Sequence, residues 1–292
     1  MVMRRVGIIG LGNVGATAAF NLFTHGYCDE IVLLDVNEAK MQAEAIDLLD
    51  TLPVNDHEVK VYYGDWDKLR DADLIIAGFG VKVTSSSEEL AINSRNAQSV
   101  GQKIKASGFN GIIINIANPC DVITTVLQKT TDLPKQKVFG IGTMLDSVRL
   151  RRVISEKLEL NSKQIGGFVL GEHGLCDFIA WSTVNHEFSD AEKAEIANEA
   201  KSNAEKLIAG KGFTNWAVTS AAMELVRAVL TDEYFYTVCS VYVEEYGIYL
   251  GYPAVIGKNG VEKIAQLSLP SDEEYHLQEA IALIKEHLAE ID

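Results

Sequence analysis

Short apolar runs recur along the first half of the chain, and longer stretches of mixed character separate them. Strands are predicted for the apolar-rich runs of four to six residues, at 6–9, 31–34, 59–62, 73–77, 111–116 and 138–141. Helices are predicted for the stretches between and after them, at 16–23, 38–49, 92–106 and 142–158. Strands that alternate with helices predict an α/β fold, in which a doubly wound parallel sheet carries helices on both faces.

The pattern changes after residue 161, where predicted strands dominate. They are expected at 165–170, 179–184, 234–243 and 254–256, and further helices at 190–208, 214–230 and from Ser271 onward. The last helix carries an apolar stripe that indicates core packing, made by Leu277, Ile281, Ile284, Leu288 and Ile291. We therefore predict two domains, the doubly wound one over residues 1–144 and an α+β domain over residues 145–292.

Composition and charge exclude several classes of partner. The chain has 292 residues, of which 47% are hydrophobic, and a net charge of −15. Nucleic acids and anionic membranes attract clustered Lys and Arg, so we expect neither as a partner. No signal-peptide pattern follows Met1 and no apolar run reaches membrane-spanning length, which favours the cytoplasm. The four cysteines are scattered, so we expect reduced thiols and no metal site.

A glycine-rich turn directly follows the first predicted strand. The segment Gly10-Leu11-Gly12-Asn13-Val14-Gly15 leads from that strand into a helix, which is the context of the dinucleotide-binding fingerprint of a Rossmann-type domain. Gly10 would allow the tight turn, Gly12 would let the backbone approach a pyrophosphate, and Gly15 would let helix and strand pack closely. We expect cofactor contacts from Gly10, Gly12, Asn13, Val14 and Gly15. The alternative is a tight turn that binds no ligand.

An acidic residue ends the second predicted strand. Asp35 follows the glycines by about 20 residues, the offset at which a carboxylate hydrogen-bonds the ribose diol of an adenosine. No arginine follows it directly, and its charge would repel a 2′-phosphate. The sequence therefore predicts NAD rather than NADP, and this prediction fails if the protein binds NADPH more tightly than NADH.

Two later strands also end in segments that suit a ligand site. Gly78-Phe79-Gly80 and Asn118-Pro119 both follow predicted strands, and ligands of such sheets bind at the carboxyl ends of the strands. The amide of Asn118 would serve a ligand or an Asx-type turn equally well, so both interpretations stay open.

Three ionisable residues form the candidate chemistry. Asp146 and Arg149 are three apart in a predicted helix and therefore share a face, where a surface ion pair is the simpler interpretation. His173 lies between glycines in Gly171-Glu172-His173-Gly174, directly after a predicted strand. A histidine on such a turn suits proton exchange near neutral pH. Taken alone, a structural histidine is the favoured interpretation.

Together these motifs resemble those of the NAD-dependent lactate and malate dehydrogenase superfamily, over nearly the whole chain. Their order is the glycine fingerprint with Asp35, then residues 118–121, 142–149, 171–174 and Gly212-Phe213-Thr214. Shorter stretches look most like L-2-hydroxyisocaproate dehydrogenases, at residues 98–101, 107–109, 121–124, 180–184 and 252–254.

The resemblance implies three catalytic roles. His173 would be the acid/base that exchanges the proton of the substrate hydroxyl. Asp146 would orient and charge-stabilise that imidazole. Arg149 would bind the substrate carboxylate with its two-pronged guanidinium, a geometry that lysine lacks.

The resemblance also implies binding roles around these residues. Asn118 would contact the substrate and the nicotinamide side, and Thr214 would line the substrate pocket. The Gly78, Phe79 and Gly80 segment would pass close to the cofactor NAD. A homodimer or homotetramer is expected from the same resemblance.

The sequence departs from the family at a mobile loop. In the family, the loop after the fourth strand carries an arginine that polarises the substrate carbonyl. Here the segment 83–89 reads as a mobile surface loop, and the matching residues 85–89 contain no arginine. Neither Lys82, at the start of the loop, nor Arg95, in the following helix, is an evident replacement. Losing such a donor costs about 10²-fold or more in rate.

The favoured hypothesis is an NAD-dependent L-2-hydroxyacid dehydrogenase. Its substrate would be a small 2-hydroxy or 2-keto monocarboxylic acid of the lactate or hydroxyisocaproate type, since Glu88 and Glu89 would disfavour a second carboxylate. One alternative is a catalytically weakened or inactive NAD-binding paralogue that acts as a sensor or assembly partner. The other is a malate dehydrogenase.

Overall fold

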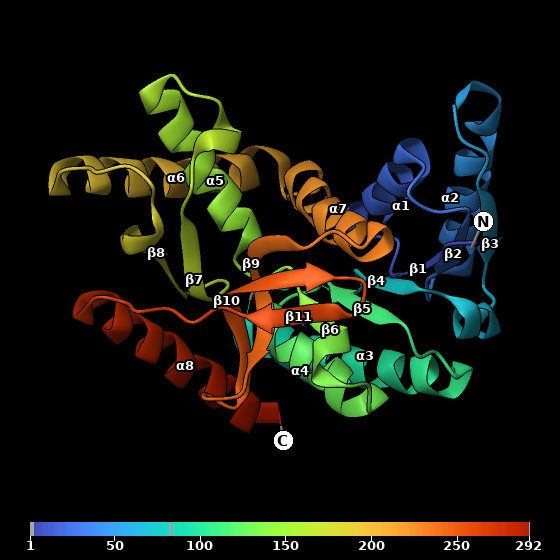
Figure 1. The fold of residues 1–292 in the computed structure, drawn as a ribbon. Helices are drawn as coiled ribbons and strands as arrows, with labels where there is room; N and C mark the ends of the chain where they lie inside the picture. The colour runs from blue at the N-terminus through green and yellow to red at the C-terminus, as the bar shows by residue number, and fades with distance from the viewer. Residues whose placement is uncertain (1–2, 82, 84, 292) are drawn as a thin grey trace.

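Six parallel strands form one half of a large sheet in the computed structural model, which describes residues 3–81, 83 and 85–291 (Figure 1). Every neighbouring pair in this half is parallel. The order is β3 (Lys60–Tyr63), β2 (Glu30–Leu34), β1 (Arg5–Ile9), β4 (Leu74–Ala77), β5 (Ile112–Asn115) and β6 (Val138–Gly140). Chain order reverses at β1, so the predicted doubly wound sheet is confirmed.

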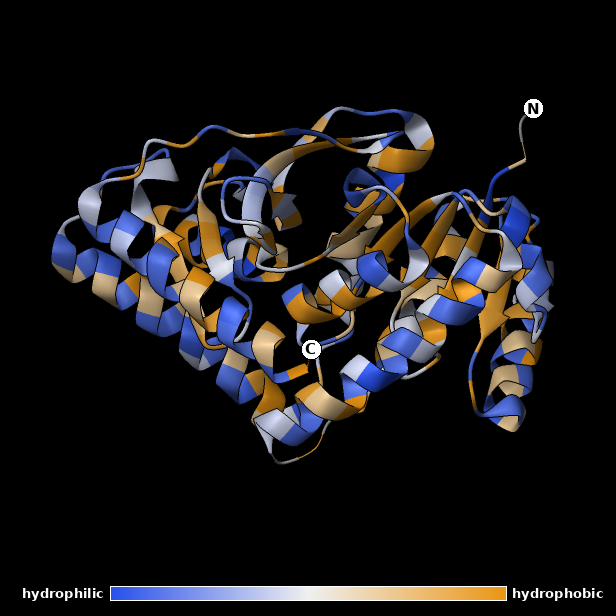
Figure 2. Cartoon of the chain, turned by 90° about the horizontal axis from the view of Figure 1, so that it is seen from below, coloured by the Kyte–Doolittle hydropathy of each residue, from blue (hydrophilic) through white to orange (hydrophobic). Residues whose placement is uncertain are grey.

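Helices cover both faces of these strands. One face carries α1 (Asn13–His25), α2 (Glu38–Asp50) and α7 (Trp216–Thr231). The other carries α3 (Ser86–Ser107) and α4 (Cys120–Thr131), as Figure 1 shows. In Figure 2 the strands are coloured hydrophobic, whereas the helices mix hydrophobic and hydrophilic residues. Both faces of β1, β2, β4, β5 and β6 are buried, which explains why these strands are largely apolar instead of alternating, whereas the edge strand β3 is partly exposed.

Neighbouring residues of one strand serve different cores. Ile8 packs into the core under α1 and α7, whereas Ile9 packs into the core under α3 and α4. Each large apolar side chain buried in this way contributes about 1.5–3 kcal/mol. These two cores hold the carboxyl ends of the strands in fixed positions.

Antiparallel strands extend the sheet beyond β6. They follow in the order β9 (Phe235–Val243), β10 (Ile248–Gly257), β7 (Phe168–Glu172) and β8 (Cys176–Ala180), and β11 (Gly260–Ile264) also pairs with β10. The helices of this half are α5 (Met144–Leu158), α6 (Asp190–Lys211) and α8 (Ser271–Ile291). Short 3₁₀ turns complete the chain at Leu52–Val54, Trp66–Asp71, Lys135–Lys137, Ser162–Gln164 and Trp181–Thr183. The predicted α+β second half is confirmed.

Some predicted strand boundaries are wrong. The strands predicted at 165–170 and 179–184 form a hairpin that is shifted inward, in which Phe168 pairs with Ala180 and Glu172 with Cys176. This register brings His173 to the turn between the two strands. The strand predicted at 254–256 is the end of β10, which pairs with β9 over nearly its whole length. The boundaries of each strand depend on the neighbouring strand with which it pairs, and local composition does not reveal that pairing.

The predicted mobile loop over 83–89 is also wrong in part, because α3 already begins at Ser86. The side chain of Ser85 caps the helix by accepting a hydrogen bond from the backbone N–H of Glu88, at 3.4 Å. Glu88 and Glu89 lie in the first turn, where acidic side chains favour the positive end of the helix dipole. Lys82 lies outside the described residues.

The last helix, α8, runs along the antiparallel half of the sheet (Figure 1). Its predicted apolar stripe is confirmed, because Leu277, Ile281 and Ile284 are buried and Leu288 and Ile291 pack against the core. Among the described residues, no helix is both long and apolar enough to cross a membrane.

Candidate active site

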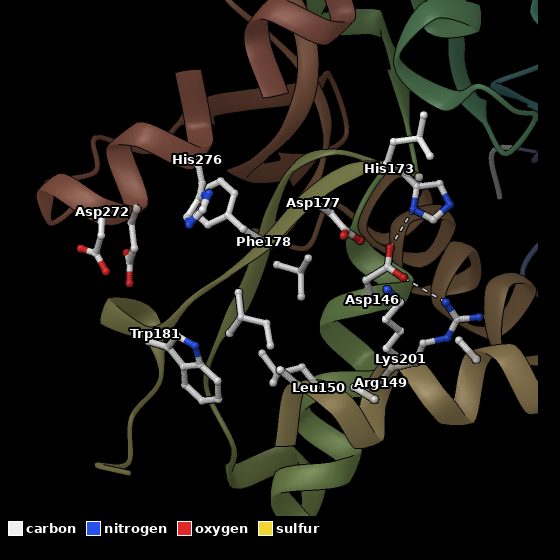
Figure 3. Close-up of a pocket in the computed structure, with 18 residues that line it drawn as sticks. Asp146, Arg149, Leu150, His173, Asp177, Phe178, Trp181, Lys201, Asp272 and His276 are labelled. Atoms are coloured by element: carbon white, nitrogen blue, oxygen red, sulfur yellow. Dashed lines mark hydrogen bonds and ion pairs between the residues drawn. The ribbon is translucent and has the colours of Figure 1, made fainter. Parts of the chain in front are cut away.

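The carboxylate of Asp146 contacts both other candidate catalytic residues, His173 and Arg149. Asp146 and Arg149 lie one turn apart at the start of α5, and His173 follows β7 in the hairpin turn. Asp146 Oδ2 lies 2.7 Å from His173 Nδ1, and its Oδ1 accepts a 2.9 Å hydrogen bond from Arg149 Nη1. Figure 3 shows the carboxylate between the imidazole and the guanidinium. The shared helix face that the sequence predicted therefore points at His173.

The turn that carries His173 is held by the residue before it. Glu172 is buried, and its Oε2 accepts hydrogen bonds from the backbone N–H groups of Leu175 (2.7 Å) and Cys176 (3.1 Å). Gly174 has a φ of +144°, a backbone conformation that residues other than glycine rarely adopt. The glycine after His173 is thus required by the turn, which fixes where the imidazole emerges.

The pair of Asp146 and His173 is charged near neutral pH. Burial lowers the pKa of His173, but the hydrogen bond and charge of Asp146 outweigh burial, and the pKa is raised to about 9. Asp121 and Asp177 add smaller contributions in the same direction. Burial raises the pKa of Asp146, but His173 and Arg149 outweigh it, and the pKa lies below its ordinary value. A protonated imidazole beside a carboxylate can give its proton to a ligand.

A cavity of about 680 Å³ opens beside this cluster (Figure 3). Asp146, Arg149 and His173 all line it. Much of the remaining wall is apolar, made by Leu150, Val169, Leu175, Phe178, Ile179, Trp181, Ala197, Ala200 and Ala204. Charged or titratable side chains complete it, from Asp177, Lys201, Asp272, Glu273 and His276.

A second cavity, of about 380 Å³, shares the turn residues His173, Gly174 and Leu175 with the first. His173 and Asn118 both line it, together with Glu89 from the first turn of α3 and His287 from α8. Thr214, in the connection before α7, does not line either of these two cavities. The structure thus brings Asn118 to His173 as predicted, but it does not show Thr214 in the cavity wall.

The glycine turn has the geometry that the fingerprint requires. A Cβ on Gly15 would lie 1.8 Å from the carbonyl oxygen of Gly10, so only glycine lets α1 pack against the turn. A Cβ on Gly12 would meet nothing within 4 Å, so the space before α1 is open. The first turn of α1 also lacks an acidic residue and a side-chain cap. Its N–H groups are therefore free to bind an anion such as a pyrophosphate.

Asp35 lies at the end of β2, beside the glycine turn. Its Oδ2 accepts a 2.6 Å hydrogen bond from the backbone N–H of Leu11, and its Oδ1 accepts one from Asn37 at 2.8 Å. The residue also lines a cavity of about 690 Å³ with Tyr63 and Trp66. A carboxylate has about four acceptor positions, so these bonds leave others for the hydroxyls of a ribose.

A buried asparagine links the segment after β4 to Asn118. Asn93 of α3 donates to the carbonyl oxygens of Val81 (3.0 Å) and Asn118 (2.9 Å), and it accepts from the N–H of Val81 (2.9 Å). This clamp ties the segment after Gly78, Phe79 and Gly80 to Asn118, so the ends of β4 and β5 form one edge.

Comparison with known proteins decides the family. Residues 4–140 match the NAD binding domain of the lactate/malate dehydrogenases, and residues 143–292 match their alpha/beta C-terminal domain. The chain belongs to the lactate/malate dehydrogenase family.

Relatives of this lactate/malate dehydrogenase family member match it over nearly their full length. L-lactate dehydrogenase 1 of Bifidobacterium longum is 36% identical and aligns over 98% of each chain. The L-lactate dehydrogenase of Fusobacterium nucleatum is 33% identical over 98% of this chain and 96% of its own. A crystal structure of the minor L-lactate dehydrogenase of Enterococcus mundtii, in its ligands-bound form, covers 100% of this chain and 99% of its own with a TM-score of 0.95 at 29% identity. A malate dehydrogenase structure from Salinibacter ruber has a TM-score of 0.91 at 26% identity and covers 98% of this chain and 97% of its own.

Family membership confirms the predicted cofactor, NAD. The residues present fit it, because Gly12 leaves open space at the start of α1, and Asp35 presents a carboxylate at the end of β2. The individual contacts predicted for Gly10, Gly12, Asn13, Val14, Gly15, Asp35, Gly78, Phe79, Gly80 and Asn118 stay predictions.

Sequence reasoning missed several residues that build this dehydrogenase site. Asp121 lies within the motif at 118–121, and the sequence assigns it no role, although its carboxylate accepts a hydrogen bond from the backbone N–H of His173. Asn93 and Glu172 were not singled out either, because their hydrogen bonds depend on tertiary contacts. A buried polar residue inside an otherwise helical or strand pattern is the available signal.

The absence of a metal site stays a prediction. In the described part of the chain, Asp146, His173 and Asp177 offer ligand atoms within 4.8 Å of one another. Sequence patterns do not reveal this group, because Asp177 lies outside the recognised motifs.

Proposed function

We propose that this protein is an NAD-dependent L-2-hydroxyacid dehydrogenase that acts on a 2-hydroxy or 2-keto monocarboxylic acid. The observation that carries the proposal is the position of Asp146 between His173 and Arg149. A proton donor and a guanidinium thus line one cavity, and reduction of a 2-keto acid needs both a proton for the carbonyl oxygen and a cation for the carboxylate.

His173 is the acid/base of this reaction. In the direction of keto acid reduction, the protonated imidazole gives its proton to the carbonyl oxygen as that oxygen becomes a hydroxyl. In the opposite direction the neutral imidazole takes the proton back. Asp146 accepts from Nδ1, which leaves Nε2 to face the substrate and stabilises the imidazolium.

Arg149 holds the carboxylate of the substrate. Only Nη1 is engaged by Asp146, and a guanidinium has five N–H donors, so a two-pronged contact remains available. Asn118 would hydrogen-bond the substrate from the neighbouring cavity. The substrate contact expected for Thr214 stays a prediction, because Thr214 lines neither cavity. NAD, when bound, supplies the hydride chemistry, and the chain supplies position and charge.

The cavity wall favours a substrate with an apolar side chain. Leu150, Phe178 and Trp181 line it, and its volume of about 680 Å³ exceeds what the methyl group of pyruvate needs. We therefore favour 2-ketoisocaproate over pyruvate as the better substrate. Glu89 lines the second cavity with His173 and would disfavour the second carboxylate of oxaloacetate.

Steady-state oxidation of NADH with 2-ketoisocaproate, pyruvate and oxaloacetate tests this function. We expect turnover with the two monocarboxylates, and the highest kcat/KM with 2-ketoisocaproate. Highest activity with oxaloacetate would contradict the substrate class. Binding of NADH without turnover on any 2-keto acid would favour an NAD-binding paralogue without catalysis.

Three broader expectations remain proposals for this chain. They are a division into domains 1–144 and 145–292, a homodimer or homotetramer, and a cytoplasmic location. Analytical ultracentrifugation tests the second directly, because a monomer at working concentration would contradict it.

A further inference from the structure

A buried carboxylate lies behind His173 and takes no part in the proton transfer described above. Asp121, in the first turn of α4, is only 2% exposed. Its Oδ2 accepts a 3.2 Å hydrogen bond from the backbone N–H of His173, and its Oδ1 accepts a 2.5 Å hydrogen bond from the hydroxyl of Ser240 on β9. One side chain therefore ties the turn of His173 to two elements of the core.

Two glycines set the position of Ser240. Strands β6 and β9 meet where Gly140 pairs with Ser240. A Cβ on Gly140 would lie 2.5 Å from Cys120 Sγ and 3.1 Å from Ser240 Cβ, and a Cβ on Gly142 would lie 2.7 Å from the Ser240 backbone nitrogen. Any larger residue would push β9 away, so the backbone fixes the hydroxyl that holds Asp121.

The charge of Asp121 acts on the groups that face it. These are Glu172 and His173 of the hairpin and Cys120 of its own helix. Burial raises the pKa of Asp121 to about 7, Glu172 acts in the same direction, and the hydrogen bonds from Ser240 and His173 oppose them. An ionised Asp121 favours the imidazolium of His173, as do Asp146 and Asp177, while Arg149 nearby opposes it.

We propose that Asp121 is a positioning residue for His173, which fixes the turn through the backbone N–H and keeps a second negative charge behind the imidazole. The inference rests on the proposed function, because it concerns the proton exchange of that same site. Asp146 contacts the ring of His173, whereas Asp121 contacts its backbone N–H and acts on the ring through its charge.

The variant Asp121→Asn removes the negative charge of residue 121 but keeps nearly the same side-chain shape. An asparagine can still accept from the N–H of His173, and its amide can donate to Ser240, so the hydrogen bonds are retained. The pKa of His173 is measured by NMR titration of its imidazole, which is assigned by its absence in His173→Gln. We expect the pKa of His173 to fall by about one unit in Asp121→Asn.

Two further variants make the result specific. Ser240→Ala removes the donor that favours ionised Asp121, so we expect a smaller fall in the pKa of His173. Asp73→Asn is the matched control, because Asp73 Oδ2 also accepts a backbone N–H, from Arg5 at 2.8 Å, but lies at the opposite end of the strands. We expect it to leave the pKa of His173 unchanged.

The titration is independent of the proposed function. A pKa of His173 that is equal in Asp121→Asn and the unaltered protein, with both folded by circular dichroism, would overturn this inference. An unaltered protein that titrates as expected but oxidises no NADH with any 2-keto acid would contradict the proposed function alone.

Discussion

Asp146 and His173 are 27 positions apart, yet Asp146 Oδ2 lies 2.7 Å from His173 Nδ1. Helix α5 positions Asp146, and the hairpin formed by β7 and β8 positions His173. The contact pairs an imidazole whose pKa is raised with a carboxylate whose pKa is lowered. Each pKa shift reflects the same ion pair, so changing either partner must change the other.

Replacing Asp146 with asparagine tests the pair directly. The amide retains a hydrogen-bonding group but no charge, so the imidazolium of His173 loses its main stabilisation. We expect kcat for keto acid reduction to fall by about 10²-fold or more, with little change in NADH binding measured by fluorescence. An unchanged kcat would show that Asp146 is only a partner of Arg149.

The pH dependence of reduction should follow His173. Reduction needs the protonated imidazole, whose pKa is raised from 6.5 to about 9. We therefore expect kcat/KM for reduction to be constant below neutral pH and to fall as pH rises through about 9. The stabilising effect of this group has the same sign, since it is fully present below pH 6.5 and is lost as pH rises through about 9. Rate profiles and thermal unfolding across pH 6 to 10 measure both, and a reduction rate that rises across this range would be inconsistent with His173 as the donor.

Replacing Arg149 with lysine should lower the activity on 2-keto acids. Lysine keeps the charge but loses the two-pronged geometry for a carboxylate. We expect kcat/KM in Arg149→Lys to fall by about 10- to 10²-fold, mainly through a higher KM for the 2-keto acid. Arg152→Lys is the control, because Arg152 pairs with Glu156 on the exposed side of the same helix. Equal kinetic constants in the two variants would show that Arg149 does not bind the substrate carboxylate.

Two glycines of the fingerprint should respond differently to alanine. A Cβ at Gly15 would lie 1.8 Å from the Gly10 carbonyl oxygen, so we expect Gly15→Ala to lower the melting temperature strongly. A Cβ at Gly12 would meet nothing within 4 Å, so Gly12→Ala should fold normally but bind NADH more weakly, by fluorescence titration. Undiminished NADH binding in Gly12→Ala would place the pyrophosphate elsewhere.

A positive charge introduced at residue 89 should assist the reaction. Glu89 lines the cavity that His173 and Asn118 share, so an arginine there can approach the carbonyl oxygen of a substrate. We expect kcat in Glu89→Arg to rise on the order of 10-fold. Glu88→Arg is the matched control, since Glu88 is exposed and does not line that cavity. If both variants behave alike, the second cavity does not receive the reacting carbonyl.

Local patterns predicted the parallel half of the fold well, because its inner strands are buried on both faces and several of them end in glycine or asparagine turns. They predicted the hairpin around His173 less well, since the register of β7 and β8 depends on pairing that no single strand encodes. The sequence predicts the start of α3 too late, because serines and glutamates are typical of loops, whereas here Ser85 caps the helix and Ser86 to Glu89 form its first turn.

The candidate site shows the same division. Turn chemistry and spacing identify Gly10 and Asp35 in the sequence, whereas the role of His173 is implied by the family resemblance, since a structural histidine is the favoured interpretation of the residue alone. Asp121, Asn93 and Ser240 are not identified in either way, because each acts through a hydrogen bond to a residue far away along the chain. The family resemblance predicted that Asp146 pairs with His173, and the structure shows the 2.7 Å distance between Asp146 Oδ2 and His173 Nδ1.

The measurement that bears most directly on the proposed chemistry is NADH oxidation with 2-ketoisocaproate by the unaltered protein and by His173→Gln. NADH binding is followed by fluorescence in the same samples. We predict turnover by the unaltered protein, loss of about 10²-fold or more in His173→Gln, and equal NADH binding by both. Equal turnover by both proteins, or binding without turnover by either, would contradict a dehydrogenase that uses His173 as its acid/base.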